Sequence, residues 1–350
     1  MHVINSESAD EVWRKAAVLV LDPDHGSPQS SRGGDTVEVL HVALQIDDPS
    51  QRWVVSRVPA INPAFALVEA LWIAAGRRDA ALPTYWNPAL PKFCGNGKDY
   101  HGAYGYRLRQ HLGVDQLDRI YHALDSAPDS RQCVLQIWDS TIDLPNLDGT
   151  AASQDIPCNI FALPKIRRGQ LEWLQVIRSN DLFRGVPHNI VQFTCLQEIL
   201  SGWLGIKPGP YVQLSDSLHV YANDIRAVRS SLVPIIDSSN TDTFALDRCA
   251  WEDAMRGVMA RLDALMRENL SRADFKAVAF CHDAPPAYDN SVIIAAADAA
   301  RRRGWSDLQD DCVDQCTNRT LVGLWSRWRV RCETARGAAS VSLPAADVTA

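Results

Sequence analysis

The sequence predicts an α/β (α+β) fold with a helical C-terminal portion, on three observations. Segments that alternate apolar and polar residues interleave with amphipathic segments up to about residue 223, as strands and helices do around one core. Beyond that point only helical spacing recurs, above all over residues 251–270. The 350 residues, 46% hydrophobic and 22% charged, are enough for a large globular core.

Capping and periodicity predict the first elements. Ser8 precedes acidic residues and an amphipathic run, which predicts a helix over 8–21. Glycine, proline and serine fill 23–35, so a turn-rich loop is expected there. Residues 36–46 alternate and are rich in β-branched side chains, which predicts a strand that pairs with a second strand over 52–58.

Later elements follow from the same signals. Proline at the start and glycine at the end delimit a helix over 62–76. Residues 82–103 mix prolines, glycines and aromatic residues without a period, so this segment is expected to be irregular and to line a pocket. The rest of the core is expected to contain, in chain order, a helix, three strands, a long helix and a strand, over residues 114–125, 131–139, 158–166, 171–181, 189–205 and 209–221.

The change of character near residue 224 predicts three parts. Residues 1–224 are expected to form the core, and residues 225–335 a helical portion packed on it, with at least one helix after 251–270. The small and polar residues of 336–350 are typical of a flexible tail.

The charge balance argues against two classes of partner. The formal net charge of −7 disfavours nucleic acid and anionic membrane surfaces, so neither is expected as a partner. No apolar run reaches transmembrane length, and residues 1–10 lack the charged and apolar regions of a signal peptide. We therefore expect a cytoplasmic protein.

The nine cysteines form an odd set without paired CxxC motifs, which favours reduced thiols over a disulfide framework. Cys312 and Cys316 could share one face of a helix, but no second ligand pair follows at metal-like spacing. No metal site is expected.

One cysteine stands ahead of two polar stretches. Cys158 lies in "DIPCNIFAL" (155–163), and a lone cysteine is by itself most often inert. The stretch "RSNDLFRGVPHN" (178–189) then supplies arginine, serine, aspartate and asparagine, and "DSLHVY" (216–221) places a histidine and a tyrosine on one face of a strand. This inventory suits an anionic, ring-shaped ligand such as a nucleotide.

These stretches resemble the thymidylate synthase family, which includes the pyrimidine-nucleotide hydroxymethylases. The motifs "IPCN", "RSNDLFRGVPHN", "LGIKPGPYV" and "DSLHVYAND" occur in the family's order over about residues 156–224. Weaker matches extend the resemblance upstream to about residue 31: "SRGGD", "ALVEALW", "GAYGYRLR" and "DSRQCVLQIWD". The resemblance implies a mixed sheet with flanking helices, a homodimer, and 5,10-methylenetetrahydrofolate as co-substrate.

The resemblance implies that Cys158 adds to C6 of a pyrimidine, a step that needs a thiolate. Arg178 matches an arginine beside that sulfur, whose charge would lower the thiol pKa and whose planar fork would hold the phosphate. Glu69 and Tyr104 match the network that moves protons near C4 and C5. Glu69 also lies in an apolar helix, where an unpaired carboxylate is costly.

The remaining implied roles concern binding. Asn189 would accept from N3–H and donate to O4, the pattern that uracil presents, whereas cytosine hydroxymethylases tend to carry aspartate there. The other implied ligands are Arg32, Ser179 and the neighbouring subunit's counterpart of Arg131 for the phosphate, His219 and Tyr221 for the sugar 3′-hydroxyl, and Asp181 and Trp86 for the folate.

Departures from the family's pattern bear on the product. Asn159 replaces the histidine that follows the nucleophile, His188 replaces a phenylalanine, and Gln132 stands where a second dimer-donated arginine is expected. The chain also ends in "LPAADVTA", unlike the short apolar tail that closes a synthase site. A dry site favours methyl and a site that admits water favours hydroxymethyl. Hydroxymethyl transfer is therefore favoured, although the C-terminal helices could replace the lid.

Other interpretations stay open from the sequence. The departures at Asn159 and Gln132 would also suit a nucleotide-binding family member without catalysis, with a regulatory or assembly role. A cysteine hydrolase would need a histidine beside the thiol, for which His219 is the candidate. Structural alternatives are a helix N-cap for Asn189, a satisfied strand pair for His219 and Tyr221, and exposed, solvated charges for Arg32 and Arg131.

Overall fold

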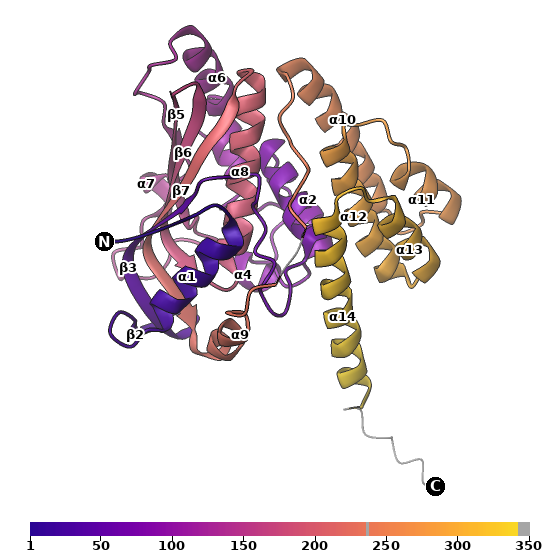
Figure 1. The fold of residues 1–350 in the computed structure, drawn as a ribbon, viewed down its shortest axis with the longest axis horizontal. Helices are drawn as coiled ribbons and strands as arrows, with labels where there is room; N and C mark the ends of the chain where they lie inside the picture. The colour runs from indigo at the N-terminus through magenta and orange to yellow at the C-terminus, as the bar shows by residue number, and fades with distance from the viewer. Residues whose placement is uncertain (236–237, 342–350) are drawn as a thin grey trace.

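A mixed seven-stranded sheet forms the centre of the computed structural model, which describes residues 1–235 and 238–341 (Figure 1). The strands are β1 (His2–Ser6), β2 (Ser27–Ser31), β3 (Gly34–Ile46), β4 (Leu135–Gln136), β5 (Asn159–Arg167), β6 (Gln170–Asp181) and β7 (Lys207–Tyr221). Their order is β1-β3-β7-β6-β5-β4, with β2 paired to β3. The pairs β1/β3 and β6/β7 are parallel, and the other pairs are antiparallel. The predicted fold class is confirmed.

The helices are α1 (Ala9–Leu21), α2 (Pro63–Ala74), α3 (Ala81–Trp86), α4 (Pro91–Cys94), α5 (Tyr104–Tyr106), α6 (Gln116–Ser126), α7 (Ser140–Asp143), α8 (Gly185–Trp203), α9 (Ile225–Ser230), α10 (Arg248–Leu265), α11 (Arg272–Ala279), α12 (Pro286–Arg303), α13 (Ser306–Gln315) and α14 (Arg319–Val341). A π-helical turn (Arg107–His111) follows α5, and a 3-10 turn (Ala222–Asp224) precedes α9. They build on the sheet in layers: α1 packs on β1 and β3, α8 on β6 and β7, α2 on α8, and α12 on α2.

Local signals specify several elements correctly. Ser8 caps α1, its hydroxyl oxygen accepting from the amide of Glu11, and Asn62 caps α2 in the same way. Gly76 follows α2 with φ +70°, a left-handed conformation that glycine adopts without steric cost. The hairpin β5–β6 turns through Arg168 and Gly169, both with positive φ.

The prediction of a strand over 52–58 is wrong. Both edges of β3 are already occupied, by β1 and β2 on one side and by β7 on the other, so no edge is free to pair. The segment instead runs through the core as an irregular stretch. Arg52 is buried there against Glu198 of α8, with its Nη2 atom 2.5 Å from the carboxylate oxygen Oε2.

Four other boundaries differ from the predictions. Residues 23–35 are not a loop throughout, because β2 pairs antiparallel with the start of β3. β1 had no alternating signal long enough to predict it, and β4 covers only two residues of the strand expected over 131–139. Finally, α8 begins at Gly185, one turn before the predicted start at Asn189.

The C-terminal helices pack on the core through α2, which contacts α10, α12 and α14 (Figure 1). Most of α12 is buried, and its small alanine side chains allow close approach to its neighbours. α14 continues to Val341, and the rest of the predicted tail, 342–350, lies outside the described residues. Among the described helices, none combines the length and apolarity that a membrane crossing requires.

Candidate active site

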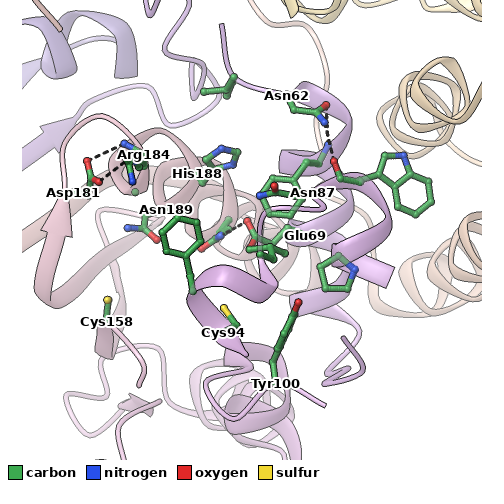
Figure 2. A pocket seen from close by; sticks show the side chains of 18 of the residues that line it. Asn62, Glu69, Asn87, Cys94, Tyr100, Cys158, Asp181, Arg184, His188 and Asn189 are labelled. Carbon is green, nitrogen blue, oxygen red and sulfur yellow. Dashed lines mark hydrogen bonds and ion pairs between the residues drawn. The ribbon is translucent and has the colours of Figure 1, made fainter. Parts of the chain in front are cut away.

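A cavity of about 680 Å³ opens between the sheet, α2 and α8, and reaches α12 and α14. Figure 2 shows side chains of α2, of α8 and of the sheet, among them Glu69, His188 and Asp181, turned toward one space. Most of the predicted site residues line this cavity: Glu69, Trp86, Tyr104, Cys158, Ser179, Asp181, Asn189, His219 and Tyr221. Arg32, Arg131, Asn159 and Arg178 are not among the lining residues.

Cys158 lies just before β5, where its carbonyl oxygen accepts from the amide of Arg178 at 2.9 Å. Burial raises the pKa of the Cys158 thiol above its ordinary value, and the Asp155 carboxylate raises it further. The charges of Arg178 and Arg32 act in the opposite direction, but burial outweighs them. The expected direction of the arginine effect is thus found for Arg178, but burial determines the net shift in the single chain.

The three predicted phosphate arginines do not line the cavity of the single chain. Arg178 braces the turn before Cys158: its Nε donates to the carbonyl of Pro157 at 2.9 Å and its Nη2 to Ile156 at 3.2 Å. Arg32 is exposed beside the β2–β3 turn, with Nη2 3.5 Å from a backbone carbonyl. Arg131 is exposed.

A chain of amides fixes the orientation of Asn189. Its Nδ2 donates to Oδ1 of Asn180 at 3.1 Å, and its Oδ1 lies 3.5 Å from Nδ2 of Asn159. Asn159 is fully buried and in turn accepts from Gln175 at 3.0 Å. Since Arg184 is the N-cap of α8, capping does not explain Asn189.

His219 and Tyr221 lie on one face of β7, with their rings edge to face at 5.5 Å between centroids. His219 pairs with Asp181 across β6 and β7, and burial lowers the pKa of the imidazole despite that carboxylate. The Asp181 carboxylate accepts from two backbone amides, of Phe183 at 2.8 Å and Arg184 at 3.0 Å. Burial nevertheless raises the pKa of Asp181.

The thiol and the imidazole do not form a hydrolase-type pair. Within the described residues, no hydrogen bond joins Cys158 to His219. The imidazole Nδ1 faces Ser217 at 3.5 Å instead. The arrangement gives no support to a cysteine hydrolase.

Glu69 is the acidic group on the helical wall of the cavity. Gln192 of α8 donates from Nε2 to its Oε2 atom at 2.6 Å. Burial raises the pKa of Glu69 to about 7, against the opposing effect of that hydrogen bond. Tyr104 is hydrogen-bonded to Asn159, and burial together with the nearby Cys158 raises the pKa of its phenol. Near neutral pH, Glu69 can therefore both hold and release a proton.

Trp86 is 1% exposed, and its indole N–H donates to the carbonyl of Ala295 in α12 at 3.2 Å. It lines the cavity but offers very little surface for stacking. Its folate role stays a prediction. The same is true of the other roles assigned to site residues.

The sequence interpretation assigned no binding or catalytic role to a second group of lining residues, in which it noted His188 only as a departure from the family pattern. Arg57, 7% exposed, stacks on Phe183 at 3.8 Å, and burial lowers the pKa of its guanidinium to about 9, with the charge of Arg331 adding to the shift. His188 and Gln192 are one turn apart on α8, a spacing that could have indicated a shared face. The C-terminal helices add a basic and aromatic wall, for which no local signal exists: Arg301, Arg302, Trp328 and Arg331.

The fold and the cavity together define the class: an α+β protein with a mixed sheet and a deep pocket that presents a thiol, a titratable carboxyl group and an oriented amide. Among the described residues no cluster of histidine, cysteine and carboxylate groups suits a metal ion. The family model for thymidylate synthase matches residues 20–240. The chain belongs to the thymidylate synthase family.

Two relatives match this chain over half of its length or more. The chain is 32% identical over 229 residues to a deoxyuridylate hydroxymethyltransferase of Bacillus phage SP01, covering 62% of this chain and 59% of the relative. It is 35% identical over 178 residues to a deoxyuridylate hydroxymethyltransferase of Pseudomonas phage M6, covering 50% and 48%. The chain thus spans about half to three fifths of the length of these relatives.

Proposed function

We propose that this chain transfers a one-carbon unit from 5,10-methylenetetrahydrofolate to C5 of a uracil nucleoside 5′-monophosphate. One observation carries the proposal: Cys158, Glu69 and Asn189 line the same cavity, which supplies a nucleophile, a proton carrier and a base-reading amide together. The cavity volume of about 680 Å³ lies in the usual range of about 300–1,000 Å³ for small-molecule sites.

In this proposal the Cys158 thiolate adds to C6 of the base, and C5 becomes an enolate-like carbon that attacks the one-carbon unit. Because the pKa of the free thiol is raised, one of two things has to form the thiolate. Either the bound nucleotide favours it, or the thiol passes its proton to a base. Asn189 is held by Asn180 so that its amide presents a fixed donor and acceptor. That order suits uracil, which offers N3–H and an acceptor at O4.

The other groups bind and orient the substrates. Ser179 and the arginines Arg32, Arg131 and Arg178 would hold the phosphate, and His219 with Tyr221 the sugar 3′-hydroxyl. Asp181 and Trp86 would hold the folate, with the basic wall of α12 and α14 facing its anionic end. The described chain fits such a co-substrate because Asp181 and this wall border one cavity.

We further propose a homodimer. Arg131 is exposed in the single chain, as expected of an arginine that reaches a partner's phosphate site. Along β6 the buried residues alternate with half-buried ones, and the half-buried Leu174 and Val176 share the less covered face of the sheet. A second copy packed on that face would bury them and bring Arg131 toward the partner's cavity.

The favoured product is hydroxymethyl rather than methyl. Both relatives described above are named for hydroxymethyl transfer to deoxyuridylate, and His188 adds a polar group to the cavity wall. A polar wall can retain water beside the reacting carbon.

The test uses the full chain with dUMP, UMP, dCMP or CMP, each labelled with tritium at C5, and methylenetetrahydrofolate. Release of tritium reports attack at C5, and mass spectrometry of the nucleotide distinguishes hydroxymethyl from methyl. A rise in dihydrofolate absorbance accompanies methyl only. The expected result is tritium release with dUMP or UMP, lost in Cys158→Ser, and a hydroxymethyl product.

A second candidate is a nucleotide-binding protein without catalysis. The raised thiol pKa of Cys158 favours it, and so does the absence of Arg32, Arg131 and Arg178 from the lining of the cavity in the single chain. It predicts saturable nucleotide binding that Cys158→Ser leaves unchanged, with no tritium release from any of the four nucleotides. That combination would reject the enzymatic proposal.

A further inference from the structure

Two side-chain contacts join α2 to α8 on the cavity wall. In the first contact, the ring of Phe65 packs edge to face on the ring of His188, with 5.1 Å between the centroids. In the second contact, the carboxylate of Glu69 accepts a hydrogen bond from the side-chain amide of Gln192 at 2.6 Å. Phe65 and Glu69 are four residues apart on α2, and His188 and Gln192 are four residues apart on α8. The two contacts are therefore about one helical turn apart. The imidazole of His188 and the carboxyl group of Glu69 therefore lie about one helical turn apart along this wall, and Figure 2 shows both on the same side of the cavity.

The two ring nitrogens of His188 meet different surroundings. Nδ1 is shielded from solvent and has no hydrogen-bond partner within the described part of the chain. Because a shielded N–H without an acceptor is rarer in proteins than a shielded acceptor without a donor, the proton belongs on Nε2. His188 lines the cavity, so Nε2–H is the donor that it can offer there.

The state of the imidazole agrees with this assignment. Burial lowers the pKa of His188 to about 3, and the charge of Arg57 lowers it further, so the ring is neutral at physiological pH. The Oε1 atom of Gln192 is likewise shielded and without a partner, since its amide is turned toward Glu69. One donor at His188 and one carboxyl oxygen of Glu69 are thus left for a guest in the cavity, and a water molecule accepts from the first and donates to the second.

We propose that His188 and Glu69 hold the water molecule that becomes the hydroxyl group of the product, which makes His188 the residue that decides the fate of the one-carbon unit. This inference rests on the proposed function. Here Glu69 is the catalytic base, and His188 acts directly on the attacking water.

The step balances without a redox partner. Once the one-carbon unit is on the nucleotide, C5 bears an exocyclic methylene group and C6 is bonded to the sulfur of Cys158. The water oxygen bonds to the methylene carbon and its proton passes to Glu69, while the double-bond electrons move onto C5 and the C4 carbonyl. Those electrons then form the C5–C6 double bond and expel the Cys158 thiolate.

The experiment measures how the methylene intermediate is divided between its products, rather than how fast it forms. The full-length chain and its His188→Phe and His188→Asn variants react with C5-tritiated dUMP and methylenetetrahydrofolate in the presence of 2-mercaptoethanol, a thiol that can take the place of water at the methylene carbon. The readout is the ratio of hydroxymethyl nucleotide to tritium released, which is independent of the fraction of folded protein. A matched control is His122→Phe, the same substitution at an exposed position of α6.

His188→Phe is expected to lower this ratio at least tenfold and to divert nucleotide into the mercaptoethanol adduct. His188→Asn, which retains an N–H donor, should recover most of the ratio, and His122→Phe should match the wild type. A ratio that is unchanged in His188→Phe, or that falls equally in the phenylalanine and asparagine variants, overturns the role of His188. Wild-type tritium release with methyl as the sole product also overturns it but leaves C5 transfer standing, whereas no tritium release rejects the proposed function itself.

Discussion

The carboxyl group of Glu69 and the amide of Gln192 join α2 to α8 through a hydrogen bond of 2.6 Å at the cavity wall. No cationic side chain is among the causes that shift the pKa of Glu69, which burial raises to about 7. A carboxyl group in this state costs little when protonated and more when ionised. The protonation state of Glu69 therefore affects the stability of the fold.

This link predicts a pH-dependent stability. The unfolded chain releases the Glu69 proton near pH 4.5 and the folded chain near pH 7, so the folded state binds more protons between these values and stability falls as pH rises. The shift corresponds to about 3 kcal/mol. Urea unfolding between pH 4.5 and 8 should show the free energy of unfolding of the wild type declining relative to Glu69→Gln, and levelling above pH 7. The partly exposed Glu172 provides a control, because Glu172→Gln should keep the wild-type slope. Parallel curves for wild type and Glu69→Gln would contradict the assignment.

The thiol of Cys158 should respond to its two charged neighbours in opposite directions. Asp155 raises its pKa and Arg178 lowers it, so Asp155→Asn should shift the pH profile of iodoacetamide alkylation to lower pH and Arg178→Gln to higher pH. Arg178→Lys retains the charge and should restore much of the profile. Mass spectrometry of the Cys158 peptide gives the rates, with the exposed Cys249 as internal reference. Shifts of the same sign in the Asn and Gln variants would refute the electrostatic explanation.

Asn189→Asp should change the preferred base. The aspartate lacks the amide N–H that the proposal directs at O4 of uracil, and an unmade hydrogen bond of this kind costs about 1–3 kcal/mol. We expect kcat/KM for dUMP to fall about 10–100-fold and the ratio of dCMP to dUMP turnover to rise. The unfolding midpoint of the variant, measured alongside, separates loss of fold from change of preference. A fall in both activities without a change in their ratio would speak against base reading by Asn189.

Local sequence signals predicted those elements whose ends are fixed by neighbouring residues. Ser8 caps its own helix, and the turn of β5–β6 contains Gly169, which adopts positive φ without steric cost. The segment 52–58 was misassigned because pairing depends on which sheet edges are free, and the partner of Arg52 lies 146 residues away. A β-rich composition alone cannot supply that information.

The site residues fall into the same two groups, those that local motifs predict and those that long-range packing brings to the cavity. Residues within the recognised motifs, such as Cys158 and Asn189, line one cavity. Arg331 reaches the same cavity from α14, and nothing in its own stretch of sequence distinguishes it from the neighbouring Arg329. Long-range packing of α14 on α2 decides which arginine faces inward.

That difference between Arg331 and Arg329 gives a matched test of the C-terminal wall. The guanidinium of Arg331 stacks on Trp328 at 4.8 Å and lines the cavity, whereas Arg329 pairs with Asp310 at 2.8 Å. If the basic wall faces the anionic end of the folate, Arg331→Ala should raise KM for methylenetetrahydrofolate about tenfold, or about 1.4 kcal/mol, and leave the Kd of dUMP within about twofold. Arg329→Ala should change neither. Equal effects of the two substitutions would rule out a folate contact by Arg331.

The buried pair Arg52–Glu198 supports the core beneath the cavity. Its closest atoms are 2.5 Å apart, both side chains are almost fully buried, and Glu198 also accepts from the amide of Phe244 at 3.1 Å. Glu198→Gln removes the counter-charge and leaves a buried guanidinium, a change that typically costs about 3–5 kcal/mol. Breaking the surface pair Arg168–Glu172, in which Arg168 is exposed and Glu172 partly exposed, with Glu172→Gln should cost less than about 1 kcal/mol. Because Phe244 belongs to the chain that leads into the C-terminal helices, Glu198→Gln should also loosen that segment, which amide hydrogen exchange over residues 239–247 measures. Equal free energies of unfolding for the two variants would show that the pair contributes no more than a surface contact.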